Sequence, residues 1–189
     1  MRKAKYERKT KETDVEVQIV LEGTGEAEVE TGIDFFDHLL ESMAKHGNFD
    51  LTAKGKGDFE HHIAEDVTIA LGKCFEKALG DKKGIRRMGD AVVPMDDSLV
   101  LVALDLGGRE YSDIDVTFEK EKIVDLTSDL FVHLLETLSS NLKCNLHVDV
   151  LRGANDHHKA EATFKALGVA LSEAVEKIGE EIPSRKGMI

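Results

Sequence analysis

Residues 61–72 read HHIAEDVTIALG, and residues 157–168 read HHKAEATFKALG, so seven of the twelve positions are identical. A second pair of stretches matches in the same order, because FDHLLES at 36–42 recurs as FVHLLET at 131–137. The offset between the copies is 95 residues for one pair and 96 for the other. A repeat with a period near half the chain indicates an internal duplication.

The hydrophobic pattern predicts a similar order of elements in each half. Apolar and polar residues alternate in 13–21 and again in 26–30, which favours two strands joined as a hairpin. The period changes to that of a helix from Asp34 onwards. The full pattern predicts helices over about 34–47, 62–79, 125–142 and 156–178, and strands over 13–21, 26–30, 48–54, 91–94, 98–106, 111–118 and 146–151. We therefore expect an α+β fold of two duplicated halves, residues 1–89 and residues 90–189 with a C-terminal tail, packed as one compact unit.

Composition excludes several classes of function. The formal net charge is −12, which disfavours binding to nucleic acids or to anionic membranes. No apolar run reaches the roughly 18 residues that a membrane-spanning helix needs, and the charged N-terminus does not resemble a signal peptide. Cys74 and Cys144 lie far apart without a CxxC spacing, which is typical of reduced thiols in a cytoplasmic protein.

The duplicated His-His-x-x-Glu motif predicts metal binding. On a helix His61 and Glu65 share one face, whereas His62 lies about 100° around the axis, so one motif can serve two metal ions. The second copy offers the same arrangement, and the matched stretches upstream add one more histidine per half. The predicted ligands are His38, His61, His62, Glu65, His133, His157, His158 and Glu161. Imidazole and carboxylate donors together suit Mn²⁺, with Fe²⁺ and Zn²⁺ as alternatives.

The repeat separates this hypothesis from ordinary surface histidines. Six of the eight histidines occupy repeat-matched positions, and only His46 and His147 do not. The sequence HExxH is absent, which disfavours a metalloprotease. Because adjacent histidines of one motif point apart, we expect sites shared between subunits rather than one self-contained site per chain.

Basic residues beside glycines are candidate phosphate ligands in a chain of this acidity. Arg87 lies between Gly84 and Gly89, Arg109 follows a glycine pair, and the tail carries Ser184 and Lys186. Guanidinium, ammonium and hydroxyl groups are suitable donors to phosphate oxygens. The phosphate-loop pattern GxxxxGK[ST] is absent.

The chain resembles the imidazoleglycerol-phosphate dehydratases over about residues 8–186. The resemblance rests on a set of short motifs in a fixed order. They are TKET at 10–13, TGIDFFDH at 31–38, HG at 46–47, HHIAED at 61–66, GIRRMG at 84–89, LDLGGR at 104–109, HHKAEATFKA at 157–166 and IPSRKG at 182–187.

The resemblance implies a fold, a reaction and a set of site residues. Each half would hold a four-stranded mixed sheet with two helices on one face. The enzyme would be a hydro-lyase of L-histidine biosynthesis that dehydrates D-erythro-imidazole glycerol phosphate to imidazole acetol phosphate, with two Mn²⁺ ions per site bound by the eight ligands above. Substrate contacts would come from Glu12, His46, Arg87, Arg109, Lys165, Ser184 and Lys186. The subunits would form a 24-mer with sites at subunit interfaces.

Some positions depart from the family pattern. The residues after His38 usually read Met-Leu-Asp-Gln but here read Leu-Leu-Glu-Ser, so Ser42 is shorter than the usual glutamine. The segment before His61 is also about three residues shorter than usual. The phosphatase domain that some bacterial members carry is absent, so only dehydratase activity is expected.

The chemistry explains why metals are needed. The proton to be removed lies on a carbon beside an imidazole rather than a carbonyl, so it is not acidic. Two metals bound to the ring nitrogens would stabilise an imidazolate whose electrons expel hydroxide. A carboxylate would take the carbon-bound proton. The candidates for this base are Glu161 and Glu65, which would also be ligands, with Glu12 as a second candidate.

Two alternatives share part of this evidence. Another di-metal hydrolase or lyase acting on a phosphorylated small molecule would use the metals and cations, but would not account for Glu12 or the 184–186 match. A metal-storage or structural assembly protein would use the ligands, but would give no reason for Arg87, Arg109 and Lys186.

Overall fold

Each half of the chain builds one four-stranded mixed sheet, in a computed structural model that describes residues 1–189. The first sheet has the order β1-β2-β4-β3 and comprises β1 (Lys3–Lys9), β2 (Thr13–Val20), β3 (Ala27–Glu30) and β4 (Asp50–Gly57). The second has the order β5-β6-β10-β7 and comprises β5 (Met88–Met95), β6 (Ser98–Asp105), β7 (Tyr111–Asp115) and β10 (Asn145–Arg152). The two sheets therefore have the same topology, as the duplication predicts.

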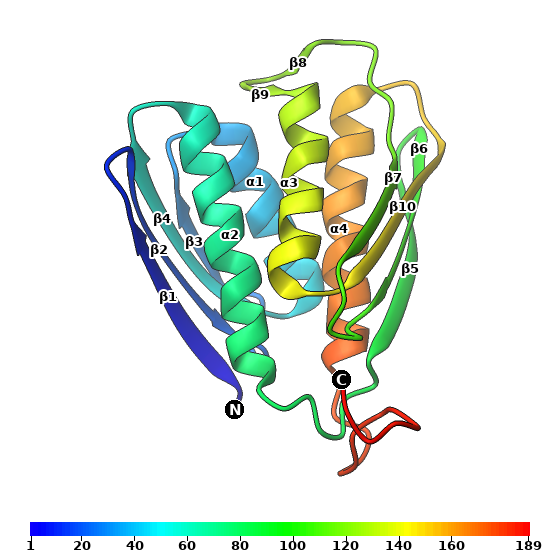
Figure 1. Cartoon of the computed structure of the whole chain (residues 1–189). Helices are drawn as coiled ribbons and strands as arrows, with labels where there is room; N and C mark the ends of the chain where they lie inside the picture. Colours follow the sequence, from blue (N-terminus) through cyan, green and yellow to red (C-terminus); the bar gives the residue numbers. More distant parts are fainter.

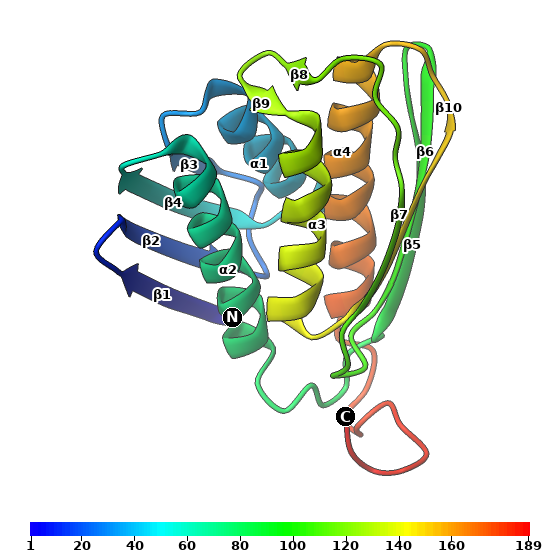
Figure 2. The same ribbon diagram turned by 45° about the horizontal axis from the view of Figure 1, so that its top comes forward.

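Four helices lie between the two sheets (Figures 1 and 2). They are α1 (Asp34–Gly47), α2 (Glu60–Leu79), α3 (Ser128–Leu142) and α4 (Asp156–Val175). Each sheet carries the two helices of its own half on one face, and the helices of the two halves then pack against each other. This arrangement confirms the predicted α+β fold of two halves with two helices on one face of each sheet.

The helices pair across the halves, α1 with α4 and α2 with α3. Both pairs cross where a glycine allows close approach. A Cβ on Gly168 of α4 would lie 2.3 Å from the carbonyl oxygen of Met43 in α1, and a Cβ on Gly72 of α2 would lie 2.7 Å from Cβ of Asn141 in α3. All four helices begin at the same end of the molecule (Figure 1). Their first turns, which carry the duplicated motifs, are therefore gathered at that end.

The predicted hairpin between 13–21 and 26–30 is wrong. β2 pairs antiparallel with both β1 and β4, and β3 pairs in parallel with β4 instead. The position beside β2 is taken by β1, a strand that the hydrophobic pattern did not predict. Its only apolar residues are Ala4 and Tyr6, and the charged residues between and around them face solvent: Lys3, Lys5, Glu7 and Lys9. Lysines on an edge strand are a common protection against unwanted strand pairing.

Two helix ends differ from the predicted ones by three residues. α3 begins at Ser128 rather than near Asp125, because Leu126–Thr127 (β9) pairs with Lys122–Ile123 (β8). α4 ends at Val175 rather than near Ile178, because Lys177 bridges to Ile85 and the Ile178 amide donates to the carbonyl of Gly84.

One continuous core joins the halves. It contains 51 buried apolar residues from both sheets and all four helices, with Phe36, Phe75 and Phe131 fully buried. None of the helices is long and apolar enough to cross a membrane. The core thus holds the four helix N-termini in a defined mutual position.

Candidate metal centre and anion site

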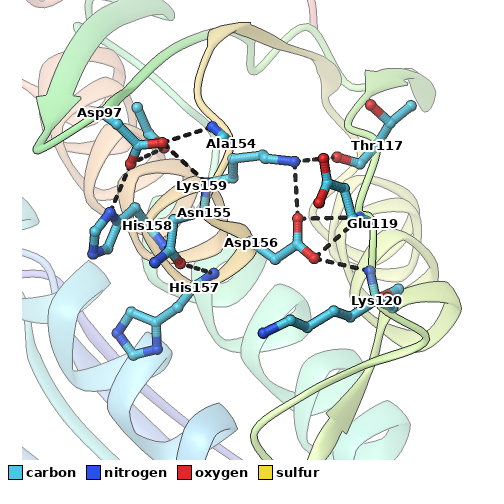
Figure 3. A network of polar contacts seen from close by, with 12 residues as sticks. Asp97, Thr117, Glu119, Lys120, Ala154, Asn155, Asp156, His157, His158 and Lys159 are labelled. Carbon is cyan, nitrogen blue, oxygen red and sulfur yellow. Dashed lines mark hydrogen bonds and ion pairs between the residues drawn. The ribbon is translucent and has the colours of Figure 1, made fainter.

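The N-terminus of α4 is shaped by its cap. The side chain of Asn155 accepts hydrogen bonds from the backbone amides of His157 (2.9 Å) and His158 (3.3 Å), which satisfies donors that a helix start leaves free. Asp156 takes no part in the cap. Its buried carboxylate instead accepts from Lys159 Nζ at 2.9 Å and from the amides of Glu119 and Lys120 (Figure 3). These bonds hold the backbone of the second motif on both sides of its histidines.

His38, His157 and Glu161 form one group, here called the α1–α4 cluster. The Glu161 Oε2 atom lies 3.3 Å from Nε2 of His38 and 3.1 Å from Nε2 of His157. The two imidazole rings are stacked with centroids 6.2 Å apart, and Phe35 packs 4.9 Å from the His157 ring. One donor atom from each of the three residues lies within 4.8 Å of the others, which suits a shared cation.

His61, Glu65 and His133 form the matching α2–α3 cluster. Glu65 lies 3.2 Å from Nε2 of His133 through one oxygen and 3.8 Å from Nε2 of His61 through the other. The two rings are stacked with centroids 6.1 Å apart and planes at 11°. Each cluster therefore joins the His-x-x-x-Glu face of one half to the upstream histidine of the other half, a combination that sequence reasoning did not predict.

The carboxylate of Glu161 is ionised and tightly held. Burial raises its pKa, but hydrogen bonds from Lys165 (2.8 Å) and His38 outweigh burial and lower the pKa below its ordinary value. A carboxylate that stays ionised at neutral pH is a suitable cation ligand.

His62 and His158 point away from both clusters, as the helical spacing predicts. Nδ1 of His62 lies 2.9 Å from Asp58 and 3.9 Å from Glu12, and Nδ1 of His158 lies 2.7 Å from Asp97. The hydrogen bond that His62 donates to the Asp58 carboxylate is the main reason why the pKa of His62 is raised. Backbone amides and the His158 contact together lower the pKa of Asp97 well below its usual range.

Glu12 lies in the turn between β1 and β2. The turn is tied to α2 because Asp66 accepts hydrogen bonds from the Thr13 hydroxyl and, at 2.7 Å, from Arg8 Nε. The Glu12 carbonyl accepts from the Asp58 amide at 3.1 Å. The Glu12 side chain is exposed and makes no hydrogen bond, and its carboxylate lies 3.9 Å from Nδ1 of His62. The donor atoms of Glu12, Asp58 and His62 all lie within 4.8 Å of one another, so this group could also hold a cation.

The predicted substrate contacts divide into two groups. His46 and Lys165 line a cavity together with His38 and Glu161 of the α1–α4 cluster. In this cavity burial, followed by the charge of Lys165, lowers the pKa of His46. Ser42, at the position where the family pattern has glutamine, lines the same cavity.

The other predicted contacts gather in a second cavity, beside the C-terminal tail. It is lined by Arg87, Arg109, Ser184 and Lys186. Arg87 is oriented by two hydrogen bonds to Asp105 (2.6 and 2.9 Å) and one to the carbonyl of Pro183 (2.9 Å), and the ion pair raises its pKa. The amide of Arg87 donates to the carbonyl of Ala174 at 2.8 Å, so this cationic cavity lies at the C-terminal end of α4. A helix of 20 residues, such as α4, is roughly 30 Å long. Within one chain, the clusters and the cationic cavity therefore lie at opposite ends of α4.

The residues present fit a pair of divalent cations. The α1–α4 cluster offers two imidazole nitrogens and one carboxylate oxygen within 4.8 Å of one another. The α2–α3 cluster offers the same donor types through contacts of 3.2 and 3.8 Å, and His62 and His158 add two further imidazoles beside carboxylates. Nitrogen donors mixed with carboxylate oxygens are the ligand set of Mn²⁺, Fe²⁺ and Zn²⁺ sites. No role was predicted from the sequence for Asp58, Asp66 and Asp97. None of the three has a repeat-matched acidic partner, and only Asp66 falls in a family motif, at the end of HHIAED.

The comparisons with known proteins agree with this architecture. A sequence model of the family described as imidazoleglycerol-phosphate dehydratase matches residues 31–171. Relatives of that name from Methanococcoides burtonii and Dehalococcoides mccartyi are each 50% identical, over 100% of this chain and 100% and 97% of their own lengths.

Solved structures of the same enzyme share the fold. The protein from Pyrococcus furiosus, in complex with (S)-C348, superposes with a TM-score of 0.87 at 34% identity and covers 97% of this chain and 100% of its own. The protein from Staphylococcus aureus superposes with a TM-score of 0.84 at 29% identity and covers 92% of this chain and 99% of its own. On the evidence of its sequence throughout and of its duplicated fold, the chain belongs to the imidazoleglycerol-phosphate dehydratase family.

Proposed function

We propose that this hydro-lyase dehydrates D-erythro-imidazole glycerol phosphate to imidazole acetol phosphate in L-histidine biosynthesis. Family membership supports the reaction, since relatives matched over their full length carry this activity in their names. The observation that carries the proposal is the pair of matched clusters at the helix N-termini, because a substrate with two ring nitrogens calls for two similar cation sites. The unpaired buried cysteines, Cys74 and Cys144, support a reducing compartment such as the cytoplasm.

The two clusters would hold two Mn²⁺ ions per active site, or Fe²⁺ or Zn²⁺ in their place. When bound, the ions would supply Lewis acidity to the substrate ring and so assist the loss of its N–H proton. Glu65 and Glu161 already contact two imidazoles each, so we assign both to ligation. Because His62 and His158 point away from both clusters of their own chain, they would complete the ligand sets of ions shared with neighbouring subunits.

Glu12 is the better candidate for the base. Its carboxylate is exposed and has no hydrogen-bond partner, whereas those of Glu65 and Glu161 are occupied. The turn that carries it is held beside His62 by Asp66, so the side chain is placed near a proposed ligand. A general base needs this geometry before it needs a particular pKa.

The phosphate group would bind in the cationic cavity of Arg87, Arg109, Ser184 and Lys186. This cavity and the clusters lie at opposite ends of the folded subunit. A small substrate can therefore contact both only if the cavity of one subunit meets the clusters of another. His46 and Lys165 line the cavity beside the α1–α4 cluster and would contact the substrate there. The proposed site is therefore shared between subunits of a large homo-oligomer, which the resemblance puts at a 24-mer.

The two sheets differ on their outer faces in a way that supports self-association. The outer face of the first sheet carries ion pairs such as Lys5–Glu16 and Lys54–Glu28. The outer face of the second sheet is apolar where β5 and β6 pair. The neighbouring residues on these two strands, here called the apolar sheet face, are Val92, Pro94, Leu99 and Leu101. Val92 is 51% exposed in the single chain. Exposed apolar surface of this kind is typical of a subunit contact.

Turnover of imidazole glycerol phosphate tests the reaction. We expect purified protein with Mn²⁺ to release imidazole acetol phosphate, and chelated protein to lose activity and regain it on addition of Mn²⁺. Inorganic phosphate should compete with the substrate. Full activity after complete removal of metal would contradict the role of the clusters, and turnover of other phosphate esters but not this substrate would favour a different lyase or hydrolase.

A further inference from the structure

Two aspartates outside the clusters hold the two histidines that point away from them. Asp97 Oδ1 lies 2.7 Å from Nδ1 of His158, and Asp58 Oδ1 lies 2.9 Å from Nδ1 of His62. The aspartates are not equivalent in the repeat, since Asp97 lies in the turn between β5 and β6 and Asp58 follows β4. In each half an aspartate therefore contacts Nδ1 of the outward-pointing histidine, although the two aspartates come from different positions in the fold.

The Asp97 carboxylate is itself held in one orientation. Its Oδ2 atom accepts hydrogen bonds from the amides of Ala154 (2.6 Å) and Asn155 (3.0 Å), so Oδ1 faces the His158 ring (Figure 3). Asn155 in turn caps the helix through the amides of His157 and His158. The ring and the helix start that carries it are thus located by one polar network.

The contact decides which ring nitrogen carries the proton in the neutral imidazole. An ionised carboxylate only accepts hydrogen bonds, so Nδ1 is the donor and Nε2 keeps its lone pair. Asp96 competes from the other side, but its Oδ2 atom lies 3.4 Å from Nε2 of His158 and its side chain is 72% exposed. The shorter and better-held contact, that of Asp97, determines the tautomer.

We propose that Asp97 and Asp58 are positioning residues that hold His158 and His62 in the Nδ1–H tautomer and so present the Nε2 lone pair of each ring to a divalent cation. The part of this inference that concerns the cation rests on the proposed function, whereas the part that concerns the tautomer does not. A carboxylate behind a ligating imidazole orients the ring and raises its basicity, and loss of such a partner costs about 10–100-fold in metal affinity.

The substitution Asp97→Asn tests the proposal. The asparagine oxygen can keep the bonds from Ala154 and Asn155, which places its NH₂ group against Nδ1 of His158 and makes Nδ1 an acceptor. Solid-state ¹⁵N NMR of histidine-labelled, metal-free protein, at a pH where the rings are neutral, should show His158 change from Nδ1–H to Nε2–H. A His158→Gln sample assigns the signal. Mn²⁺ affinity, measured by titration calorimetry, should fall by about 10–100-fold.

Two further variants serve as controls. Asp96→Asn removes the same charge one residue away and should leave the tautomer of His158 unchanged. Asp58→Ala removes the carboxylate that faces Nδ1 of His62, in an exposed position whose loss does not threaten folding, and should change the signal of His62 alone.

The outcomes separate this proposal from the proposed function. A wild-type His158 in the Nε2–H form, an unchanged tautomer in Asp97→Asn, or a reversed tautomer with wild-type Mn²⁺ affinity would each overturn the positioning role. Wild-type protein that binds no Mn²⁺ would overturn the proposed metal function, while the NMR result on metal-free protein would still decide whether Asp97 sets the ring.

Discussion

Glu12 and Glu161 differ in what already contacts them, and this difference predicts different losses on substitution. Glu12→Gln should lower kcat by about 10²–10⁴-fold, because it removes the proposed base without touching either cluster. Bound metal, measured by elemental analysis, should remain at the wild-type level. Glu161→Gln should instead lose metal along with activity, because Glu161 joins His38 to His157. Glu161→Gln protein with full metal content and near-normal turnover would show that Glu161 is neither ligand nor base.

Lys159 and Asp156 form a buried ion pair within the first turn of α4, beside the loop of residues 117–120. Their side chains are 6% and 3% exposed, and Lys159 also donates to the carbonyl of Thr117 at 2.8 Å (Figure 3). Lys159→Met should lower the free energy of unfolding by about 3–5 kcal/mol, because it leaves a buried carboxylate without its cation. Urea denaturation measures the loss. Lys120→Met removes the same charge from an exposed side chain of the same region and should cost much less.

The same pair predicts a dependence of stability on pH. Burial raises the pKa of Asp156, but the bonds from Lys159 and two backbone amides outweigh it and lower the pKa below the ordinary value of 3.8. The contribution of Asp156 is therefore complete above that value and is lost as the pH falls through the lower, folded-state pKa. The difference in unfolding free energy between wild type and Asp156→Asn should shrink under strongly acid conditions. A difference that stays constant down to that range would contradict the lowered pKa.

At this scale the sequence predicted the residues better than their partners. Spacing on a helix was enough to separate His62 from His61, and the repeat pointed to all eight candidate ligands. It could not pair His38 with His157, because that contact joins helices of different halves whose packing depends on the whole core. Asp97 could not be paired with His158 either, because it lies in a turn of the same half, 61 residues away in the chain.

The glycine crossings belong to the scale of the elements. Gly168→Ala should force α4 away from α1, because the added Cβ would meet the backbone oxygen of Met43 at 2.3 Å. We expect a loss of about 1–3 kcal/mol in unfolding free energy and weaker Mn²⁺ binding, because His38 and His157 move apart with their helices. Gly179→Ala is the matched control, since its Cβ would meet nothing within 4 Å. Equal stability and metal affinity in the two variants would show that the crossing does not set the α1–α4 cluster.

Helices were easier to predict than strands for a physical reason. Each helix buries a wide apolar stripe between two layers, so its period is clear over many residues. β1 buries little and is held by its backbone pairing with β2 and by the Arg8–Asp66 contact, neither of which leaves an alternating apolar pattern. Because β1 was not predicted, β2 had no predicted neighbour, and the alternating segment 26–30 was wrongly paired with it as a hairpin.

At the scale of the whole molecule, the unequal outer faces of the sheets predict how copies meet. Leu101→Lys puts a charge into the apolar sheet face and should break the assembly into smaller species. Static light scattering should then report masses nearer the 20.9 kDa of one chain. Gln18→Lys adds the same charge to the solvated face of the first sheet and should leave the assembly intact. Activity should fall with assembly, because the cationic cavity and the clusters would no longer meet, and wild-type protein that is monomeric and active would contradict the shared site.

The pairing of helices across the halves also bears on the order of events while the chain is being made. Glu65 meets His133 across 68 residues of sequence, and Glu161 meets His38 only after α4 exists. A nascent chain that has left the ribosome up to Gly80 carries His38, His61, His62 and Glu65, yet possesses neither cluster. Loading of the α2–α3 cluster must then wait for α3, and that of the α1–α4 cluster for the last helix, so any cation captured before α3 would be held by an isolated motif and exchange freely. Mn²⁺ should accordingly bind the complete chain far more tightly than a fragment ending at Gly80, a comparison that calorimetry can make directly.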